Sequence, residues 1–265
     1  MIVVKLGGAD GIDVDAVVRD LAGLGEPWVL VHGGNAELDH VSRALGCEPR
    51  FVTSPSGHTS RVTDRETMRA MQMVYRGRRN NEIVRQLQAL GVDAVGLSGV
   101  DGRLWQAERK TAVRYVENGR KFLLRDDYTG KVVRVNADLV QLLLAAGYVP
   151  VMTLPAITAD GEAVNVDGDR AAAAVAVALR AEALLLLSNV PGLLCDLSDP
   201  ETLVPRVKRH ELGDVSGLAG GRMKKKLLAA GEALDGGVPR VVLATADSKS
   251  PVRDALAGVG TVIRC

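Results

Sequence analysis

Four short segments combine flexible glycine backbone with charged side chains, and they follow one another in a fixed order along the chain. Lys5-Leu6-Gly7-Gly8 and His32-Gly33-Gly34-Asn35 each come directly after an apolar run. Asn165-Val166-Asp167-Gly168-Asp169 carries two carboxylates, and Gly220-Gly221-Arg222-Met223 leads into three lysines. Backbone N–H groups and lysines bind phosphate, and a carboxylate can hold the lysines in place. The set and its order therefore favour phosphoryl transfer from ATP to a carboxylate.

The two glycine pairs follow predicted strands. We expect them to leave backbone N–H groups open toward an anion, with Lys5 as a point charge beside the first pair. The chain contains no Gly-x-x-x-x-Gly-Lys-Ser/Thr sequence, so this is not a P-loop. Taken alone, each pair is also typical of an ordinary strand–helix turn. We interpret His32 as structural rather than as a general base, since phosphorylation of a carboxylate at neutral pH requires no proton abstraction.

Three further polar positions suit a substrate. Arg61 could bind a carboxylate bidentately through two guanidinium N–H groups, although alone it is typical of a surface residue. Asp167 is well placed to cap the following helix, whereas Asp169 in its first turn could pair with lysines. Asn165 could bind an amide or a carboxylate.

Two segments nearer the C-terminus suit a nucleotide. Ser188-Asn189-Val190-Pro191-Gly192-Leu193 follows a predicted strand, where ligands bind in open α/β sheets, but it is equally typical of a Pro-Gly turn. Lys224, Lys225 and Lys226 are consecutive on a predicted helix. We expect at least two of them to lie on a solvated face and one to reach the phosphoryl group.

Composition places the chain among soluble globular proteins. It has 265 residues, 47% of them hydrophobic and 25% charged. The three cysteines lack metal-ligand spacing, which favours a reducing cytosol. No signal-peptide pattern opens the chain, and no apolar run is long enough to span a bilayer. We therefore expect a cytosolic protein that does not enter a membrane.

The order of elements predicts an α/β protein. Apolar strand-like runs lie at residues 2–6, 28–31, 95–97, 148–153, 183–188, 241–243 and 261–263. Helical spacing occurs at residues 14–24, 36–45, 67–90, 136–146, 171–180, 227–234 and 252–256. This alternation favours a mostly parallel sheet that is covered on both faces. Residues 103–134 alternate polar with apolar around Asn118-Gly119, which predicts an antiparallel excursion containing a hairpin.

Charge is distributed unevenly. Residues 61–134 contain 16 Lys/Arg and 9 Asp/Glu, whereas the remainder contains 17 and 23. A basic field of this kind favours an acidic partner. Nucleic acid is disfavoured, because the basic region contains few aromatic residues and the pI of the chain is about 7.7.

Over essentially its whole length the sequence resembles the amino acid kinase family, and most of all its acetylglutamate kinase branch. The resemblance implies that Lys5 and Lys226 stabilise the transition state and that Asp169 orients both lysines. It implies substrate contacts at Gly33, Gly34, Arg61 and Asn165. It implies nucleotide contacts at Gly7, Gly8, Asn189, Val190, Pro191, Gly192, Leu193, Leu194, Leu218, Ala219 and Gly220.

Two departures from that branch are informative. Acetylglutamate kinases usually have His-Gly-Gly-Gly where this chain has Asn35, and Ser-Asp-Val-x-Gly where it has Ser188-Asn189-Val190-Pro191-Gly192. The latter segment and residues 60–64, 97–102, 110–119 and 127–130 instead resemble [LysW]-aminoadipate kinases. Those enzymes act in lysine biosynthesis on 2-aminoadipate that is attached through its amino group to a small acidic carrier protein. We expect the basic residues of region 103–134 to dock such a carrier.

The resemblance also implies the architecture and the cofactors. We expect a three-layer α/β/α sandwich with a central, mostly parallel sheet, an acyl-substrate lobe at residues 1–157 and a nucleotide lobe at residues 158–265. ATP would bring Mg²⁺ with it, without a dedicated protein metal site, and the protein would be a homodimer. Two alternatives stay open: an N-acetylglutamate kinase of arginine biosynthesis, alone or in a dual enzyme, and a ligand-binding regulatory homologue without catalysis.

Overall fold

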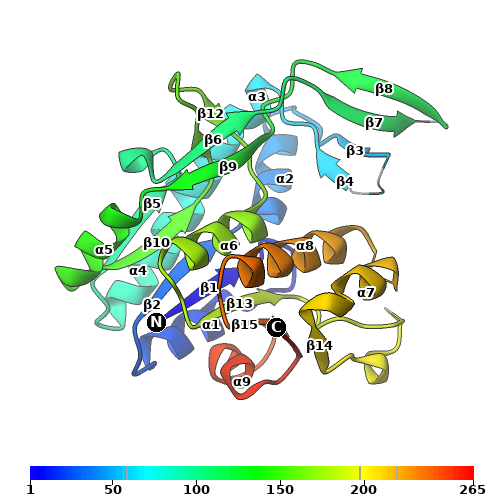
Figure 1. Cartoon of the computed structure of the whole chain (residues 1–265). Helices are drawn as coiled ribbons and strands as arrows, with labels where there is room; N and C mark the ends of the chain where they lie inside the picture. Colours follow the sequence, from blue (N-terminus) through cyan, green and yellow to red (C-terminus); the bar gives the residue numbers. More distant parts are fainter. Residues whose placement is uncertain (56, 58, 118, 197, 219) are drawn as a thin grey trace.

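A mostly parallel sheet organises the chain, as the computed structural model shows (Figure 1). The structure describes residues 1–265 apart from Ser56, His58, Asn118, Leu197 and Ala219. The sheet has eight strands in the order β14-β16-β15-β13-β1-β2-β10-β5, and among these the β15–β16 pair is antiparallel. The strands span Ile2–Leu6 (β1), Trp28–His32 (β2), Ala94–Ser98 (β5), Val149–Thr153 (β10), Ala183–Ser188 (β13), Arg206–Lys208 (β14), Arg240–Thr245 (β15) and Thr261–Arg264 (β16). The α/β fold class is confirmed.

Two smaller four-stranded sheets extend from this body. The first has the order β12-β11-β6-β9 and the second β4-β3-β7-β8. Their strands are Phe51–Thr53 (β3), Thr59–Arg61 (β4), Trp105–Arg109 (β6), Val113–Glu117 (β7), Arg120–Leu124 (β8), Gly130–Val135 (β9), Ala156–Ile157 (β11) and Ala163–Val164 (β12). β7 and β8 pair antiparallel and project from the body in Figure 1, as the alternation predicts. Gly119 has a φ of +74° there, while Asn118 of the predicted turn lies outside the described residues.

Helices cover both faces of the central sheet. They are Val14–Ala22 (α1), Asn35–Ala44 (α2), Arg65–Met71 (α3), the π-helix Gln72–Asn80 (η1), Asn81–Ala89 (α4), Ala137–Ala145 (α5), Gly168–Ala178 (α6), Leu212–Leu218 (α7), Gly221–Asp235 (α8) and Pro251–Ala257 (α9), with 3₁₀ turns at Asp101–Arg103, Pro200–Thr202 and Arg209–Glu211. α6 and α8 run side by side across one face (Figure 1). Within the described part of the chain, no helix is long and apolar enough to cross a membrane.

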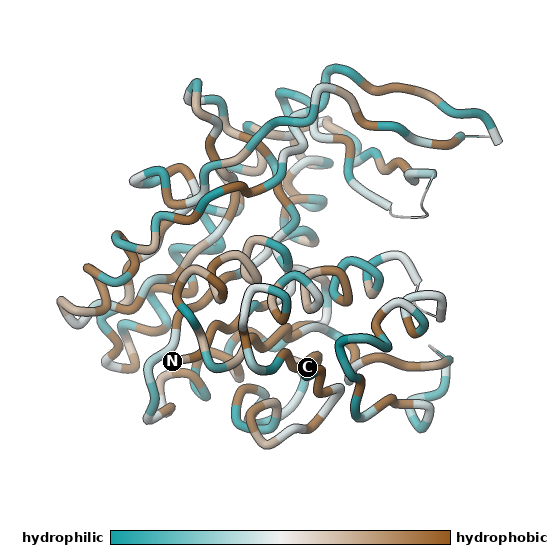
Figure 2. The backbone as a smooth tube through the Cα atoms, viewed as in Figure 1, coloured by the Kyte–Doolittle hydropathy of each residue, from teal (hydrophilic) through white to brown (hydrophobic). Residues whose placement is uncertain are grey.

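The alternation of side chains along β1 determines which face of the sheet carries Lys5. Ile2, Val4 and Leu6 are buried in the apolar cluster that includes residues of α1 and α9. Val3 is buried in the other cluster, which includes residues of α6 and α8. Because side chains alternate along a strand, Lys5 shares the face of Val3. Figure 2 shows the apolar colouring concentrated along these central strands.

Two helices begin earlier than their apolar spacing predicts. Apolar spacing predicts a helix from residue 171, whereas α6 starts at Gly168 because the side chain of Asp167 accepts hydrogen bonds from the N–H groups of Asp169 and Arg170. This confirms Asp167 as the cap. Similarly, α8 starts at Gly221 rather than at residue 227, so its first turns contain the basic cluster of Lys224, Lys225 and Lys226.

The glycine loops after β1 and β2 lie in direct contact. A Cβ atom on Gly8 would clash with the backbone nitrogen of Gly34 and would be 2.6 Å from that of Asn35. The Gly8 carbonyl accepts from the N–H of Ala36, and the N–H of Gly33 donates to the carbonyl of Leu6. This approach excludes any side chain at residue 8.

We predict that Gly8→Ala lowers the free energy of unfolding by about 1–3 kcal/mol, because backbone atoms must move to admit the methyl group. Urea unfolding of the purified variant measures this loss. Gly25→Ala is the matched control, since a Cβ atom there meets nothing within 4 Å. Equal stability of the two variants would contradict the close approach.

Candidate active site

Three charged side chains from distant parts of the chain meet near the C-terminal end of the central strand β1, on the face of the sheet that α6 and α8 cover. Lys5 lies on β1, Asp169 in the first turn of α6, and Lys226 in the second turn of α8. The Lys5 Nζ atom is 2.6 Å from Asp169 Oδ1, and the Lys226 Nζ atom is 3.1 Å from Asp169 Oδ2. All three residues are about 8% exposed. One carboxylate thus holds two buried lysines, and these are the three residues to which the family resemblance gives catalytic roles.

Burial and charge act in opposite directions on this cluster. Burial alone would raise the pKa of Asp169, but the positive charges of Lys226 and Lys5 outweigh it and hold that pKa well below its ordinary value. Burial lowers the pKa of Lys226, and Asp169 restores it only in part while Lys5 lowers it further. The cluster carries one excess positive charge in a site with little water. It is therefore suited to bind an anion.

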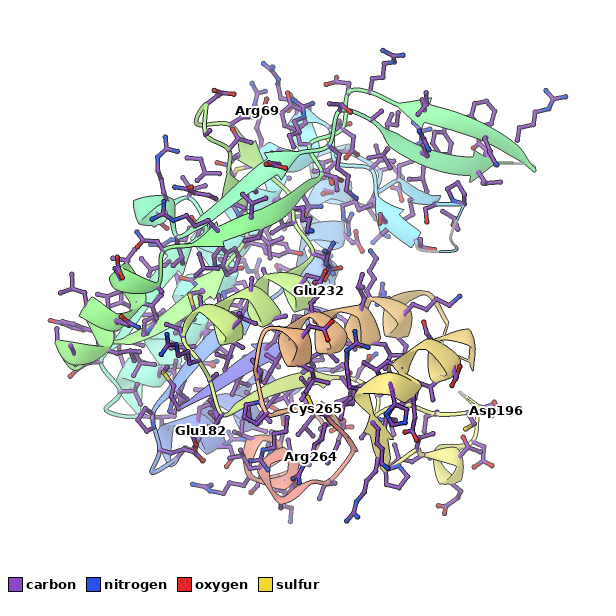
Figure 3. The ribbon with its side chains drawn as sticks, in the orientation of Figure 1. Arg69, Glu182, Asp196, Glu232, Arg264 and Cys265 are labelled. Carbon is purple, nitrogen blue, oxygen red and sulfur yellow. The ribbon has the colours of Figure 1, made fainter. Side chains whose placement is uncertain are left out.

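A second ion pair keeps α6 and α8 together beside this cluster. Arg170 follows Asp169, and its Nε and Nη2 atoms donate to the two carboxylate oxygens of Glu232 at 2.8 and 2.5 Å. Figure 3 shows Glu232 on α8. Because this bidentate pair joins the two helices, it stabilises the relative placement of Asp169 and Lys226.

The basic cluster of α8 is less solvated than its sequence predicts. Lys224 and Lys225 are both half-buried, so the expectation that two of the three lysines lie on a solvated face is wrong. Lys225 donates to the hydroxyl of Ser60 at 3.1 Å and lies 3.9 Å from Asp167. β4 carries Ser60 across the start of α8, and this tertiary contact leaves no signal in the local sequence.

More backbone N–H groups of the glycine loops are hydrogen-bonded within the protein than the sequence predicts. The N–H groups of Gly7 and Gly33 donate to the carbonyls of Leu187 and Leu6, so neither faces a ligand. The N–H of Gly8 has no acceptor among the described residues. Among the residues that the structure describes, no side chain caps the N-terminus of α8 after Gly220, so first-turn N–H groups there are also suited to an anion.

His32 is held in one neutral form by its buried neighbours. The side-chain amide nitrogen of Asn80 lies 2.9 Å from the carbonyl of Val151, which can only accept, and 3.0 Å from His32 Nε2. Nε2 is therefore the acceptor, and Nδ1–H donates to the carbonyl of Gly33 at 3.1 Å. Burial lowers the pKa of His32 to about 4. This geometry supports a structural role for the ring.

Arg61 is buried rather than on the surface. Its Nη2 atom is 2.5 Å from Asp39 Oδ1, and its guanidinium lies 4.8 Å from the ring centroid of Phe51. The Arg61 Nη1 atom is buried and has no hydrogen-bond partner among the described residues. Asp39 thus fixes one edge of the guanidinium and leaves the other for a carboxylate. Sequence analysis missed Asp39, because the pair joins α2 to β4 and only the fold brings them together.

Asn165 and the segment after β13 differ in how they are held. The side-chain amide of Asn165 donates to the hydroxyl of Thr63 at 2.9 Å.

The N–H of Leu193 donates to the hydroxyl of Thr261, and a Cβ atom on Gly192 would lie 2.6 Å from that oxygen. Leu193 and Leu194 are buried, and the carbonyl of Leu193 also accepts from the N–H of Val204, so both backbone groups of Leu193 are bonded within the protein. Ala219 of the expected nucleotide contacts lies outside the described residues.

A cavity of about 320 Å³ adjoins the glycine loops. Its lining includes Gly8, Gly34, Glu37 and Arg79. Burial lowers the pKa of the Arg79 guanidinium, which has no ion-pair or hydrogen-bond partner among the described residues. The structure therefore provides open space beside the loops that follow β1 and β2.

Comparison with known proteins agrees with this geometry. Residues 1–245 match the family model described as the amino acid kinase family. The chain belongs to the amino acid kinase family. It is 56% identical, over 99% of its own length and 91% of the relative, to the [LysW]-aminoadipate kinase of Deinococcus radiodurans. It is 52% identical, over the full length of both chains, to the [LysW]-aminoadipate kinase of Thermus thermophilus.

A solved amino acid kinase-like structure shares the fold over the whole chain. The N-acetylglutamate synthase from Neisseria gonorrhoeae, complexed with coenzyme A and N-acetyl-glutamate, superposes with a TM-score of 0.78 at 25% sequence identity. The match covers 100% of this chain and 59% of the synthase. The three-layer architecture is therefore that of the amino acid kinase family.

The pKa of Lys226 predicts how kinase activity depends on pH. A lysine whose pKa is lowered is charged below that pKa and loses its charge as pH rises through it. We expect kcat/KM of this amino acid kinase to fall on the alkaline side below the ordinary lysine pKa of about 10.4, because kcat/KM reports the ionisation of the free enzyme. Lys226→Arg keeps a positive charge and should move this fall to higher pH, whereas Lys224→Arg should leave it unchanged. Identical profiles for wild type and Lys226→Arg would exclude Lys226 as the titrating group.

Proposed function

We propose that this kinase transfers the γ-phosphoryl group of ATP to the side-chain carboxylate of 2-aminoadipate held on a LysW-type carrier protein, as a step of lysine biosynthesis. The observation that carries the reaction type is the buried Lys5–Asp169–Lys226 cluster near the C-terminal end of β1. The substrate is supported by the full-length similarity to the two [LysW]-aminoadipate kinases.

In the proposed step, a carboxylate oxygen attacks the γ-phosphorus as the bond to the β-phosphate oxygen breaks. ADP leaves with that bonding pair, and an acyl phosphate forms. Lys5 neutralises the transferring group, Lys226 the leaving phosphates, and Asp169 holds both lysines. Among the described residues, no cluster of three or more His, Cys, Asp or Glu could hold a metal, so we propose that Mg²⁺ arrives on the phosphates of the nucleotide and offsets their charge.

We propose that residues 1–157 form the acyl-substrate lobe and residues 158–265 the nucleotide lobe. Arg61 and Asn165, with the loop of Gly33 and Gly34, would bind the acyl substrate. The segment after β13 and the start of α8, together with the Gly7–Gly8 loop through the N–H of Gly8, would bind the nucleotide. We also propose a homodimer, on the basis of the family resemblance alone; light scattering of the purified protein tests it.

The β7–β8 hairpin is the proposed docking surface for the acidic carrier. Arg114, Arg120 and Lys121 are exposed on it and have no ion-pair partner among the described residues. Arg109 differs, because its side chain donates to the carbonyl of Asp127 and to both carboxylate oxygens of Glu162 and lies over the ring of Tyr128. Arg109 therefore anchors the base of the hairpin rather than contacting a carrier.

The decisive measurement is ATP-dependent acyl-phosphate formation, trapped with hydroxylamine. We expect carrier-linked 2-aminoadipate to react with a kcat/KM at least about tenfold above that of carrier-linked glutamate or free N-acetylglutamate. Equal or faster turnover of free N-acetylglutamate would assign the protein to arginine biosynthesis instead. Nucleotide binding without transfer to any of the three acceptors would favour a regulatory homologue.

Reversal of charge on the hairpin tests the docking surface. We predict that Arg114→Glu, Arg120→Glu and Lys121→Glu together lower kcat/KM for carrier-linked aminoadipate about 10- to 100-fold at low salt, with less effect as salt screens the charges. The control is Arg206→Glu with Lys249→Glu, which reverses two exposed charges away from the hairpin. If both variants turn over the carrier-linked substrate like wild type at low salt, the hairpin is not the docking surface.

A further inference from the structure

Asn35 occupies the position where acetylglutamate kinases usually have the third glycine of His-Gly-Gly-Gly. In the structure it is the first residue of α2 and follows the Gly33-Gly34 turn directly. Its backbone nitrogen lies against Gly8, since a Cβ atom on Gly8 would be 2.6 Å from it. Gly8 follows Lys5 by three residues and lies just after the C-terminal end of β1. Asn35 thus begins its helix at the contact between the two glycine loops.

Tyr75 holds the side chain of Asn35 in one orientation. The Tyr75 hydroxyl donates to Asn35 Oδ1 at 2.8 Å, and its ring packs on Gly34. Burial raises the pKa of Tyr75 to about 12, although the charge of Arg61 and the N–H of Gly34 act to lower it. The hydroxyl therefore stays protonated and directs its hydrogen to the amide oxygen.

This bond leaves the other end of the amide available. Asn35 is exposed, and its Nδ2 group has no acceptor among the described residues. A glycine offers no such donor at this position, and an amide held by its oxygen presents its N–H groups in a fixed direction.

The proposed acyl-substrate contacts surround the same tyrosine. Asp39 lies one helical turn after Asn35, and residues four apart share a face of a helix. Asp39 is ion-paired to Arg61, and the charges of both act on the Tyr75 hydroxyl. Asn35 and the Arg61–Asp39 pair therefore lie around the same tyrosine hydroxyl, and Asn35 directly follows the Gly33-Gly34 turn.

We propose that Asn35 contacts the acyl substrate by donating a hydrogen bond from Nδ2 to a carboxylate or amide oxygen, and that Tyr75 is a positioning residue that orients this amide. The inference rests on the proposed function, and it adds a residue that helps select the acyl substrate. Neither residue takes part in bond formation. Their contribution is to binding, so it is expressed in KM for the acyl substrate rather than in KM for ATP.

Asn35→Asp isolates the donor. The aspartate keeps an acceptor for the Tyr75 hydroxyl and places a negative charge in the first turn of α2, where it favours the helix, so folding is preserved. We expect KM for carrier-linked aminoadipate to rise at least about tenfold in the hydroxylamine assay, because the variant loses a donor and repels a substrate carboxylate. KM for ATP should stay within about twofold of wild type.

The role of Tyr75 is tested by combining substitutions at Tyr75 and Asn35. Tyr75→Phe should raise KM for the acyl substrate by a smaller factor, about threefold, and Asn35→Gly should raise it about tenfold. Because Tyr75 acts through Asn35, the double variant Asn35→Gly with Tyr75→Phe should be no worse than Asn35→Gly alone. Tyr75 with a merely structural role would instead add its full effect to the double variant, and that result would overturn the positioning role.

Turnover by the wild-type protein distinguishes failure of the Asn35 assignment from failure of the proposed function. If wild type forms acyl phosphate from carrier-linked aminoadipate but Asn35→Asp and Asn35→Gly keep the wild-type KM, the assignment of Asn35 is wrong and the proposed function stands. If wild type forms no acyl phosphate from carrier-linked aminoadipate, the proposed function fails and the assignment of Asn35 fails with it.

Discussion

The burial of two lysines around one carboxylate is the constraint on which the rest of the structure depends. Taking charges out of water is expensive, and Asp169 compensates for only one of the two ammonium groups. The cluster is stable only if β1, α6 and α8 hold the three side chains at contact distance. The fold does this with independent devices: strand alternation for Lys5, the Asp167 cap for Asp169, and the Arg170–Glu232 pair for the spacing of α6 and α8. The uncompensated positive charge is suited to attract an anion.

The two glycine loops that follow β1 and β2 are closely apposed. Gly8 and Gly34 touch without room for a side chain, and the carbonyl of Gly8 helps start α2. Gly7 and Gly33 direct their N–H groups to strand carbonyls, which fixes the loops rather than serving a ligand. His32, neutral and buried, adds a further bond to the carbonyl of Gly33. The N–H of Gly8 is left without an acceptor among the described residues, and a donor that the fold holds in place needs little reorganisation when an anion binds.

Much of this arrangement follows from local sequence, and the exceptions have a common cause. Apolar runs and their spacing place the strands and helices, and the family motifs place Lys5, Asp169 and Lys226. The sequence does not reveal that Asp39 holds Arg61, that Ser60 contacts Lys225, or that Tyr75 orients Asn35. Each of these joins elements that only the tertiary fold brings together. The sequence also groups Arg109 with the other basic residues of region 103–134. Its contacts in the fold, with Glu162 among them, instead place it at the base of the hairpin.

Selection of the acyl substrate is a problem of small energy differences. Aminoadipate and glutamate differ by one methylene, which a pocket discriminates by only about 1–3 kcal/mol. A carrier adds recognition at a distance from the reacting carboxylate, and an exposed basic hairpin supplies it through charge without narrowing the pocket. A donor such as the amide of Asn35 acts differently, because a polar group that the wrong substrate leaves without a partner costs more than a missing methylene. In the proposed function the hairpin and the amide therefore have separate roles, since the hairpin selects the carrier and the amide selects what the carrier presents.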